Sequence, residues 1–310
     1  MPAPTTEMRE VLDFLAEQKR GKPSRYSIPF EEARRALVEE RKWWIETAPQ
    51  MTRIERETLQ VGGRRVEIQS AVPEDADTSV EIIYLHGGGW CVGSFDTHAA
   101  IVQGIAKACR HTVTNLDYSL APEHPFPAAA EDLQHVLAEL RRRRPPSTRW
   151  VLAGDSAGAN LALLEAMRAR EEGEPPPDAL VLLYGVYLPQ RPSHSMLAFG
   201  DGSYGLSLQA MARYEKHYLA GREGDAVPSA FPLFRSLRNL PPMYIGAAEL
   251  DPLHDDSIRL HDAVQDYGGQ STLAVYRGVV HGFLTYGRTM KAPSEAFADI
   301  AAFLTSITAP

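Results

Sequence analysis

The pentapeptide Gly154-Asp155-Ser156-Ala157-Gly158 constrains the fold of this chain more than any other segment. An apolar run at residues 151–153 precedes it, and a stretch of alanines and leucines typical of a helix follows it. The pattern G-x-S-x-G between a strand and a helix is typical of a sharp turn that exposes a serine hydroxyl at the edge of a sheet. Glycines are favoured there because a Cβ would collide with the crowded flanks of the turn.

Short apolar runs alternate with helix-like segments along most of the chain. Residues 54–61 and 64–71, which flank Gly62-Gly63, predict a hairpin. The other predicted strands are 80–85, 112–117, 150–153, 180–184, 243–247 and 272–277. The predicted helices between them are 99–109, 128–143, 157–172, 255–267 and 294–307. This alternation predicts an α/β fold, with a mostly parallel sheet flanked by helices and ligands bound at the carboxyl ends of the strands.

Two segments interrupt this alternation. The N-terminal segment has apolar residues at helical spacing, and residues 187–240 hold four prolines and a predicted helix at 208–219. An insertion of this length between strands is typical of a lid. We therefore expect a helical cap in two parts over a core in two parts. The cap comprises residues 1–52 and 187–240, and the core comprises residues 53–186 and 241–310.

A serine hydroxyl attacks a carbonyl only when a base takes its proton and an acid orients that base. His281 is the candidate base among ten histidines, because it follows a predicted strand and precedes Gly282-Phe283. Asp251 is the candidate acid, because it follows the predicted strand at 243–247. The resulting order is serine, aspartate, histidine.

Three other acids compete with Asp251. Glu249 lies before the loop opens, and Asp255 and Asp256 fall about one turn into the next predicted helix. We therefore favour Asp251. The same helix carries His254 and His261, but this cluster lacks the spacing of a known metal motif and indicates solvated charges.

The attack also needs backbone N–H groups aimed at the oxyanion that forms. The segment His86-Gly87-Gly88-Gly89-Trp90 follows a predicted strand directly, and its glycines allow the backbone to approach a substrate. Gly88 and Gly89 are the expected donors from this loop. Ala157, the residue after Ser156, is the expected third donor.

Taken together, these motifs resemble those of the hormone-sensitive-lipase family of bacterial esterases. The resemblance covers roughly residues 80–285. It rests on His86–Trp90, Gly93-Ser94-Phe95-Asp96-Thr97-His98, Leu120-Ala121-Pro122-Glu123-His124-Pro125-Phe126-Pro127-Ala128-Ala129, Gly154–Gly158, Asp251-Pro252-Leu253 and His281-Gly282-Phe283. The chain departs from the family pattern at Ser119, Ala159 and Gly185, none of which is a catalytic position.

The resemblance implies an α/β-hydrolase fold and hydrolysis of carboxylic esters with short to medium acyl chains, without a cofactor or metal. It makes Ser156 the nucleophile, Asp251 the orienting acid and His281 the base. Gly88, Gly89 and Ala157 would form the oxyanion hole. A lactone or an activated amide fits the same chemistry and stays an alternative. A non-catalytic receptor on this fold is less favoured, because receptors of the family have lost the base that this chain keeps in His281.

Aromatic and other large apolar side chains near these motifs are candidates for the pocket wall. We expect Trp90, Tyr187 and Phe283 near the substrate. Phe95, Met196, Phe199 and Tyr204 are further candidates. Asp155 and Glu123 are expected to hold loops by buried hydrogen bonds, and Cys91 is expected to be a small buried apolar residue.

Composition limits the partners and the cellular location that we expect for this protein. A net charge of −8 argues against nucleic acid or an anionic membrane as the main partner. Two cysteines and a charged N-terminal segment predict a cytoplasmic protein, and no apolar stretch is long enough for a membrane span. The expected partner is a small-molecule ester, and the sequence leaves both a monomer and a homodimer open.

Overall fold

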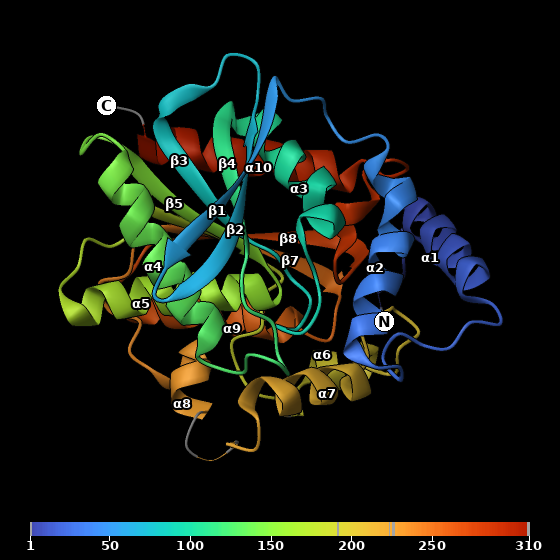
Figure 1. The fold of residues 1–310 in the computed structure, drawn as a ribbon. Helices are drawn as coiled ribbons and strands as arrows, with labels where there is room; N and C mark the ends of the chain where they lie inside the picture. Colours follow the sequence, from blue (N-terminus) through green and yellow to red (C-terminus); the bar gives the residue numbers. More distant parts are fainter. Residues whose placement is uncertain (1, 191, 223, 225–226, 309–310) are drawn as a thin grey trace.

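The computed structural model describes residues 2–190, 192–222, 224 and 227–308. Within these residues, eight strands form one sheet in the order β1-β2-β4-β3-β5-β6-β7-β8 (Figure 1). The strands are β1 (Arg53–Val61), β2 (Arg64–Val72), β3 (Asp77–Leu85), β4 (His111–Asp117), β5 (Arg149–Asp155), β6 (Ala179–Leu183), β7 (Met243–Leu250) and β8 (Ser271–Val280). β2 is antiparallel to both β1 and β4, and all other neighbours are parallel. The predicted hairpin and the mostly parallel sheet are confirmed.

Alternating side chains along the central strands divide the core into two layers. Leu152 of β5 packs with α4 (Ala128–Arg143), α5 (Ala157–Glu172) and α9 (His254–Asp266) on one face of the sheet. Val151, its neighbour on the same strand, packs with α3 (Phe95–Cys109) and α10 (Ala292–Thr308) on the other face. Successive side chains of a strand point to opposite faces, so both faces of this sheet are apolar and both are covered.

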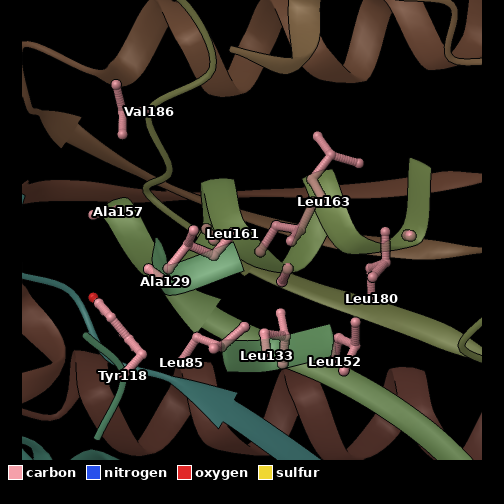
Figure 2. Close-up of a cluster of buried hydrophobic side chains, with 14 of the residues drawn as sticks. Leu85, Tyr118, Ala129, Leu133, Leu152, Ala157, Leu161, Leu163, Leu180 and Val186 are labelled. Carbon is pink, nitrogen blue, oxygen red and sulfur yellow. The ribbon is translucent and has the colours of Figure 1, made fainter. Parts of the chain in front are cut away.

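The first of these layers surrounds the helix that follows the pentapeptide. Figure 2 shows leucines from five elements gathered in one cluster, and these are Leu85 of β3, Leu133 of α4, Leu152 of β5, Leu161 of α5 and Leu180 of β6. All five side chains are essentially excluded from water. This packing fixes the position of α5 beneath the carboxyl ends of the strands.

Helix α3 begins at Phe95, four residues before the predicted start at 99. The backbone N–H of Ser94 donates to Thr97 Oγ1 at 2.9 Å, which satisfies a group at the helix start that would otherwise lack a partner. The buried Phe95 then joins the core from the first turn. The predicted bounds of α4, α5 and α7 (Leu208–Leu219) match those of the structure.

Residues 1–52 and 187–240, which interrupt the alternation of strands and helices, both contain helices. The N-terminal segment forms α1 (Thr6–Lys19) and α2 (Phe30–Ile45), and the insertion contains α6 (His194–Phe199), α7, α8 (Val227–Ala230) and the short helix η1 (Pro232–Phe234). In Figure 1, α2 and α7 come together beside the sheet. Phe30 of α2 and Tyr214 of α7 belong to one buried apolar cluster, and Arg213 Nη1 donates to the carbonyl of Arg25 at 3.2 Å. Among the described residues, no helix combines the length and apolar character that crossing a bilayer requires.

Helix α5 lies unusually close to the end of β3. A Cβ added to Gly158 would lie 1.8 Å from the carbonyl oxygen of Leu85, a distance that no relaxed structure tolerates. Only glycine therefore permits this helix–strand approach.

We predict that Gly158→Ala lowers the free energy of unfolding by about 3 kcal/mol, because the added methyl group meets backbone that cannot move aside. Denaturant unfolding measures the change. Gly287→Ala is the matched control, because Gly287 has helical dihedral angles (φ −61°, ψ −13°) and its added Cβ would lie in ordinary contact, 3.6 Å from Pro293. The control is expected to be neutral or slightly stabilising. Equal stability of both variants would contradict the close approach.

Candidate active site

Ser156 occupies the turn between β5 and α5. Its backbone has φ +54° and ψ −118°, a conformation that is strained for a residue with a side chain. The Ser156 N–H donates to the carbonyl of Leu183 at 2.8 Å, which ties the turn to the end of β6. The side chain keeps 8% of its surface exposed and lines a cavity at the carboxyl ends of the strands.

A chain of two hydrogen bonds connects Ser156 to a buried acid. His281 Nε2 lies 3.0 Å from Ser156 Oγ, and His281 Nδ1 lies 2.7 Å from Asp251 Oδ2. A carboxylate only accepts, so Nδ1 carries the proton and Nε2 is free to accept from the serine. Asp251 is fully buried, and its other oxygen accepts the N–H of Leu253 at 2.8 Å. The three predicted catalytic residues thus lie in one hydrogen-bonded line, at the ends of β5, β7 and β8.

The three competing acids instead accept hydrogen bonds from backbone N–H groups. Glu249 accepts the N–H of Gly278 at 2.7 Å, and Asp255 accepts the N–H of Ser195 at 3.1 Å. Asp256 accepts the N–H groups of Tyr187 and Leu188 at 2.8 and 3.1 Å. These carboxylates therefore hold the edge strand β8 and two parts of the insertion.

The glycine-rich loop after β3 lines the same cavity as Ser156. Gly88 and Gly89 have φ +123° and +59°, and an added Cβ would lie 2.0 Å from the carbonyl oxygen of Val92 or 2.4 Å from the ring of Tyr214, respectively. Ala157 is the first residue of α5, so its N–H has no acceptor within the helix. Gly88 and Gly89 thus line the same cavity as Ser156, and Ala157 directly follows it at the positive end of the α5 dipole.

Asp155 joins this loop to the turn that carries the nucleophile. Its Oδ1 accepts from Tyr84 Oη at 2.7 Å and from the N–H of Gly87 at 2.8 Å. Burial alone would raise the pKa of Asp155, but His98 nearby and these hydrogen bonds lower it to about 2. The carboxylate is therefore charged throughout the neutral range, in the buried structural role expected for it.

Glu123, in the loop after β4, pairs with helix α2, but its side chain is 51% exposed, so the prediction of a buried role for it is wrong. Arg34 of α2 donates to Glu123 at 3.0 and 2.6 Å, and also to the carbonyls of Cys91 and Ala121 at 2.8 and 3.0 Å. Cys91 itself is buried, and burial raises the pKa of its thiol to about 12. The thiol is therefore protonated and acts as the small buried group predicted for it.

Only one of the three side chains expected near the substrate lines the cavity. Trp90 does so, and its ring stacks on Tyr218 with the centroids 4.1 Å apart. Tyr187 is instead fully buried. A Cβ added to Gly185 would lie 2.1 Å from the hydroxyl oxygen of Tyr187. Phe283 packs against Tyr184 and Tyr276 below the site. Neither Tyr187 nor Phe283 is among the lining residues, because each ring turns inward into the core.

Of the further candidates, Tyr204 lines the cavity, whereas Phe95, Met196 and Phe199 are buried in the core. The sequence analysis placed the N-terminal segment in the cap but named none of its residues for the cavity wall. The lining residues of this segment include Lys19, Arg25, Glu40, Arg41 and Trp44. A signal was present in the helical spacing of Leu37, Arg41 and Trp44, which places the arginine on the apolar face of α2.

Two other clusters have structural roles. His254 Nδ1 lies 2.9 Å from the carbonyl of Ala248, and His261 Nδ1 lies 2.8 Å from Ser271 Oγ. Within the described part of the chain, no group of three or more metal-ligating side chains is present. The arginines at the end of α4 are paired with neighbours, as in the bonds from Arg143 Nη1 to Glu57 at 2.7 Å and, just after the helix, from Arg144 Nε to Glu81 at 2.9 Å.

Comparison with known proteins agrees with this architecture. A family model described as alpha/beta hydrolase fold matches residues 82–285. A hyperthermophilic esterase from the archaeon Pyrobaculum calidifontis is 30% identical, with 99% of each chain covered and a TM-score of 0.91. The ester hydrolase EH1AB1 from the metagenome of Lake Arreo, solved with a derivative of bipyridine phosphonate, is 26% identical over 98% of each chain, with a TM-score of 0.91.

A third relative is EstE1, a thermostable carboxylesterase cloned from a metagenomic library. It is 29% identical, with 92% of this chain and 99% of EstE1 covered and a TM-score of 0.86. The chain belongs to the hormone-sensitive-lipase family of α/β-hydrolases. It is an esterase-like member of that family.

The buried carboxylate of Asp256 accepts the N–H groups at the start of the insertion, and the pKa of this carboxyl makes the anchor testable. Burial raises its pKa to about 6, against the opposing effect of the N–H groups of Tyr187 and Leu188. The folded-state pKa lies above the ordinary value of 3.8. The folded state therefore binds more protons between these values, and stability falls as the pH rises through that window.

We predict that the free energy of unfolding of the wild type falls by about 3 kcal/mol relative to Asp256→Asn between pH 3.5 and pH 7. The asparagine oxygen still accepts the two N–H groups but does not ionise. Denaturant unfolding at a series of pH values measures the difference. Asp262→Asn, which removes an exposed carboxylate from the same helix, is the control. Parallel pH profiles for the wild type and Asp256→Asn would contradict the prediction.

Proposed function

We propose that this protein is a serine carboxylesterase that hydrolyses short- to medium-chain carboxylic esters through an acyl-enzyme. The observation that carries the proposal is the line of hydrogen bonds from Ser156 through His281 to Asp251. It supplies a nucleophile, a base within reach of its proton and a buried acid that holds the base in the required tautomer. The esterases among the structural relatives support the same reaction class.

In the first half of the reaction, Ser156 Oγ attacks the ester carbonyl carbon while its proton passes to His281 Nε2. The carbonyl oxygen becomes an oxyanion that accepts from the N–H groups of Gly88, Gly89 and Ala157. Asp251 stabilises the imidazolium that forms. Collapse of the tetrahedral intermediate breaks the bond to the alcohol, which leaves with the proton from His281, and the acyl group stays on Ser156.

In the second half, His281 takes a proton from water as the water oxygen attacks the acyl-enzyme. A second oxyanion forms in the same hole. Its collapse releases the carboxylic acid and returns the proton to Ser156 Oγ. No step requires a cofactor.

The cap is part of the proposal. We assign residues 1–52 and 187–240 to it, over a core of residues 53–186 and 241–310. Both cap segments contribute to the wall of the cavity, for example through Leu12 and Trp44 of the first and Tyr204 and Met211 of the second. The mixture of leucine, methionine and aromatic side chains suits an apolar acyl chain, and such a wall separates neighbouring chain lengths by only about 1–3 kcal/mol per methylene. Modest selectivity is therefore expected.

We predict that p-nitrophenyl esters are hydrolysed with an optimum at a short or medium acyl chain in a series from acetate to laurate. Ser156→Ala is expected to lower kcat by at least about 1,000-fold, because the attacking group is lost while binding and the oxyanion hole remain. Initial rates of p-nitrophenolate release measure both effects. Ser306→Ala, at an exposed serine of α10, is the control.

If folded wild-type protein hydrolysed none of these esters, the carboxylesterase assignment would be withdrawn. A lactone and an anilide, assayed in parallel with a simple ester, test the same triad on the alternative substrates. Turnover of the lactone or the anilide above that of the ester would assign lactone hydrolysis or amidase activity instead. Tight ligand binding without any turnover would indicate a receptor, an assignment that the hydrogen-bonded His281 disfavours.

A further inference from the structure

The wall of the cavity built by the N-terminal helices is rich in positive charge. Lys19 ends α1, Arg25 lies in the connection to α2, and Arg41 lies in the last part of α2. Glu40 is the only carboxylate that this segment contributes to the lining among the described residues. Three cations therefore face one anion on this wall.

The anion is already paired. Arg25 Nη1 forms an ion pair with Glu40, and Arg25 Nη2 donates to Tyr26 Oη at 2.8 Å. This pair leaves the positive charges of Lys19 and Arg41 without a carboxylate from the same segment. Burial, together with the nearby Arg25 and Arg41, lowers the pKa of Lys19 against the opposing effect of Glu40, as expected where positive charge is in excess.

The other carboxylates of the cavity are engaged with backbone or side-chain donors. Glu215 of α7 accepts the N–H of Gln190 at 2.7 Å. Asp155 accepts from Tyr84 and from the N–H of Gly87. The structure shows no hydrogen bond or ion pair from either carboxylate to Arg41 among the residues it describes.

Arg41 lines the cavity beside the residue that follows the base. Its Nη1 is buried and finds no hydrogen-bond acceptor among the described residues. Its Cζ lies 5.9 Å from the centre of the Tyr286 ring, and a Cβ added to Gly282 would lie 4.0 Å from its Nη2. Gly282 directly follows the base His281. A guanidinium with a buried, unsatisfied N–H is costly unless an anion completes its hydrogen bonds.

We propose that Arg41, assisted by Lys19, binds the carboxylate of an anionic ester, so that the substrates are esters whose acyl or alcohol part carries a carboxylate group. This inference rests on the proposed esterase function and names its substrate class. The planar guanidinium offers two parallel N–H groups to a carboxylate, a geometry that a neutral group of the same shape does not match. The apolar lining around it accommodates the chain between the ester and the carboxylate.

The test compares each anionic ester with a neutral isostere. For the acyl side, mono-4-nitrophenyl adipate is compared with 4-nitrophenyl 6-methylheptanoate, in which an isopropyl group replaces the carboxylate. For the alcohol side, 4-carboxyphenyl butyrate is compared with 4-isopropylphenyl butyrate. The quantity measured is the ratio of kcat/KM for the anionic ester to that for its isostere, after subtraction of the rate with Ser156→Ala.

In Arg41→Met this ratio is expected to fall at least about tenfold in one of the two series, because a hydrogen-bonded charge pair is lost. The series that responds shows whether the carboxylate belongs to the acyl or the alcohol part. Arg41→Lys keeps the charge but not the paired N–H groups, so its ratio is expected to lie between those of the wild type and Arg41→Met. Added potassium chloride is expected to lower the wild-type ratio by screening the attraction.

Arg35→Met is the matched control. It removes the same charge from the same helix at an exposed position, where Arg35 pairs with Glu31. Its ratio is expected to equal that of the wild type. An unchanged ratio in Arg41→Met in both series, with neutral esters still hydrolysed by the wild type, would overturn this inference and leave the esterase function intact. No hydrolysis of any ester by the wild type would instead overturn the proposed function.

Discussion

The contact between α5 and the end of β3 is the constraint on which the site depends. Because residue 158 has no side chain, the first turn of α5 reaches the carbonyl of Leu85. Two residues earlier, Ser156 has a strained backbone conformation and lines the cavity at the sheet edge. The contact between α5 and β3 also aims the N-terminus of the helix at the point where the oxyanion would form. The surrounding leucine cluster supplies the packing that keeps this strained turn in place.

Charged groups then fix the parts of the site relative to one another. Asp155 holds the glycine-rich loop against the turn that carries Ser156, through the N–H of Gly87. Arg34 of α2 donates to the Cys91 carbonyl of that loop, and also to Glu123 and the Ala121 carbonyl in the loop after β4. The loop that is proposed to bind the oxyanion is thus held by both the core and the N-terminal helices. Donors fixed in advance stabilise a developing charge without the cost of reorienting when it appears.

Most helices and strands could be predicted because each is set by residues that lie close together in the sequence. The hairpin around Gly62-Gly63, the helix that follows Ser156 and the helix at Leu208–Leu219 each have a strong periodic or turn pattern. The start of α3 was predicted four residues too late, although the bond between Ser94 and Thr97 that accompanies it is also local. The positions of the Tyr187 and Phe283 rings depend on which space the core leaves open, and no sequence pattern carries that information.

The sequence by itself determined the fold class, the order of serine, acid and base, and the glycine-rich loop, because turns, strand ends and backbone freedom are set by residues adjacent in the chain. The sequence also favoured Asp251 as the acid, from its place after a predicted strand, and the tertiary structure places its carboxylate 2.7 Å from His281 Nδ1. Only the tertiary structure showed what the carboxylates of Glu249, Asp255 and Asp256 bind instead. It also decided that Arg41, distant in sequence from every motif, lies beside the residue that follows the base. Proximity between segments separated by hundreds of residues arises from packing the whole chain, and a local pattern does not encode it.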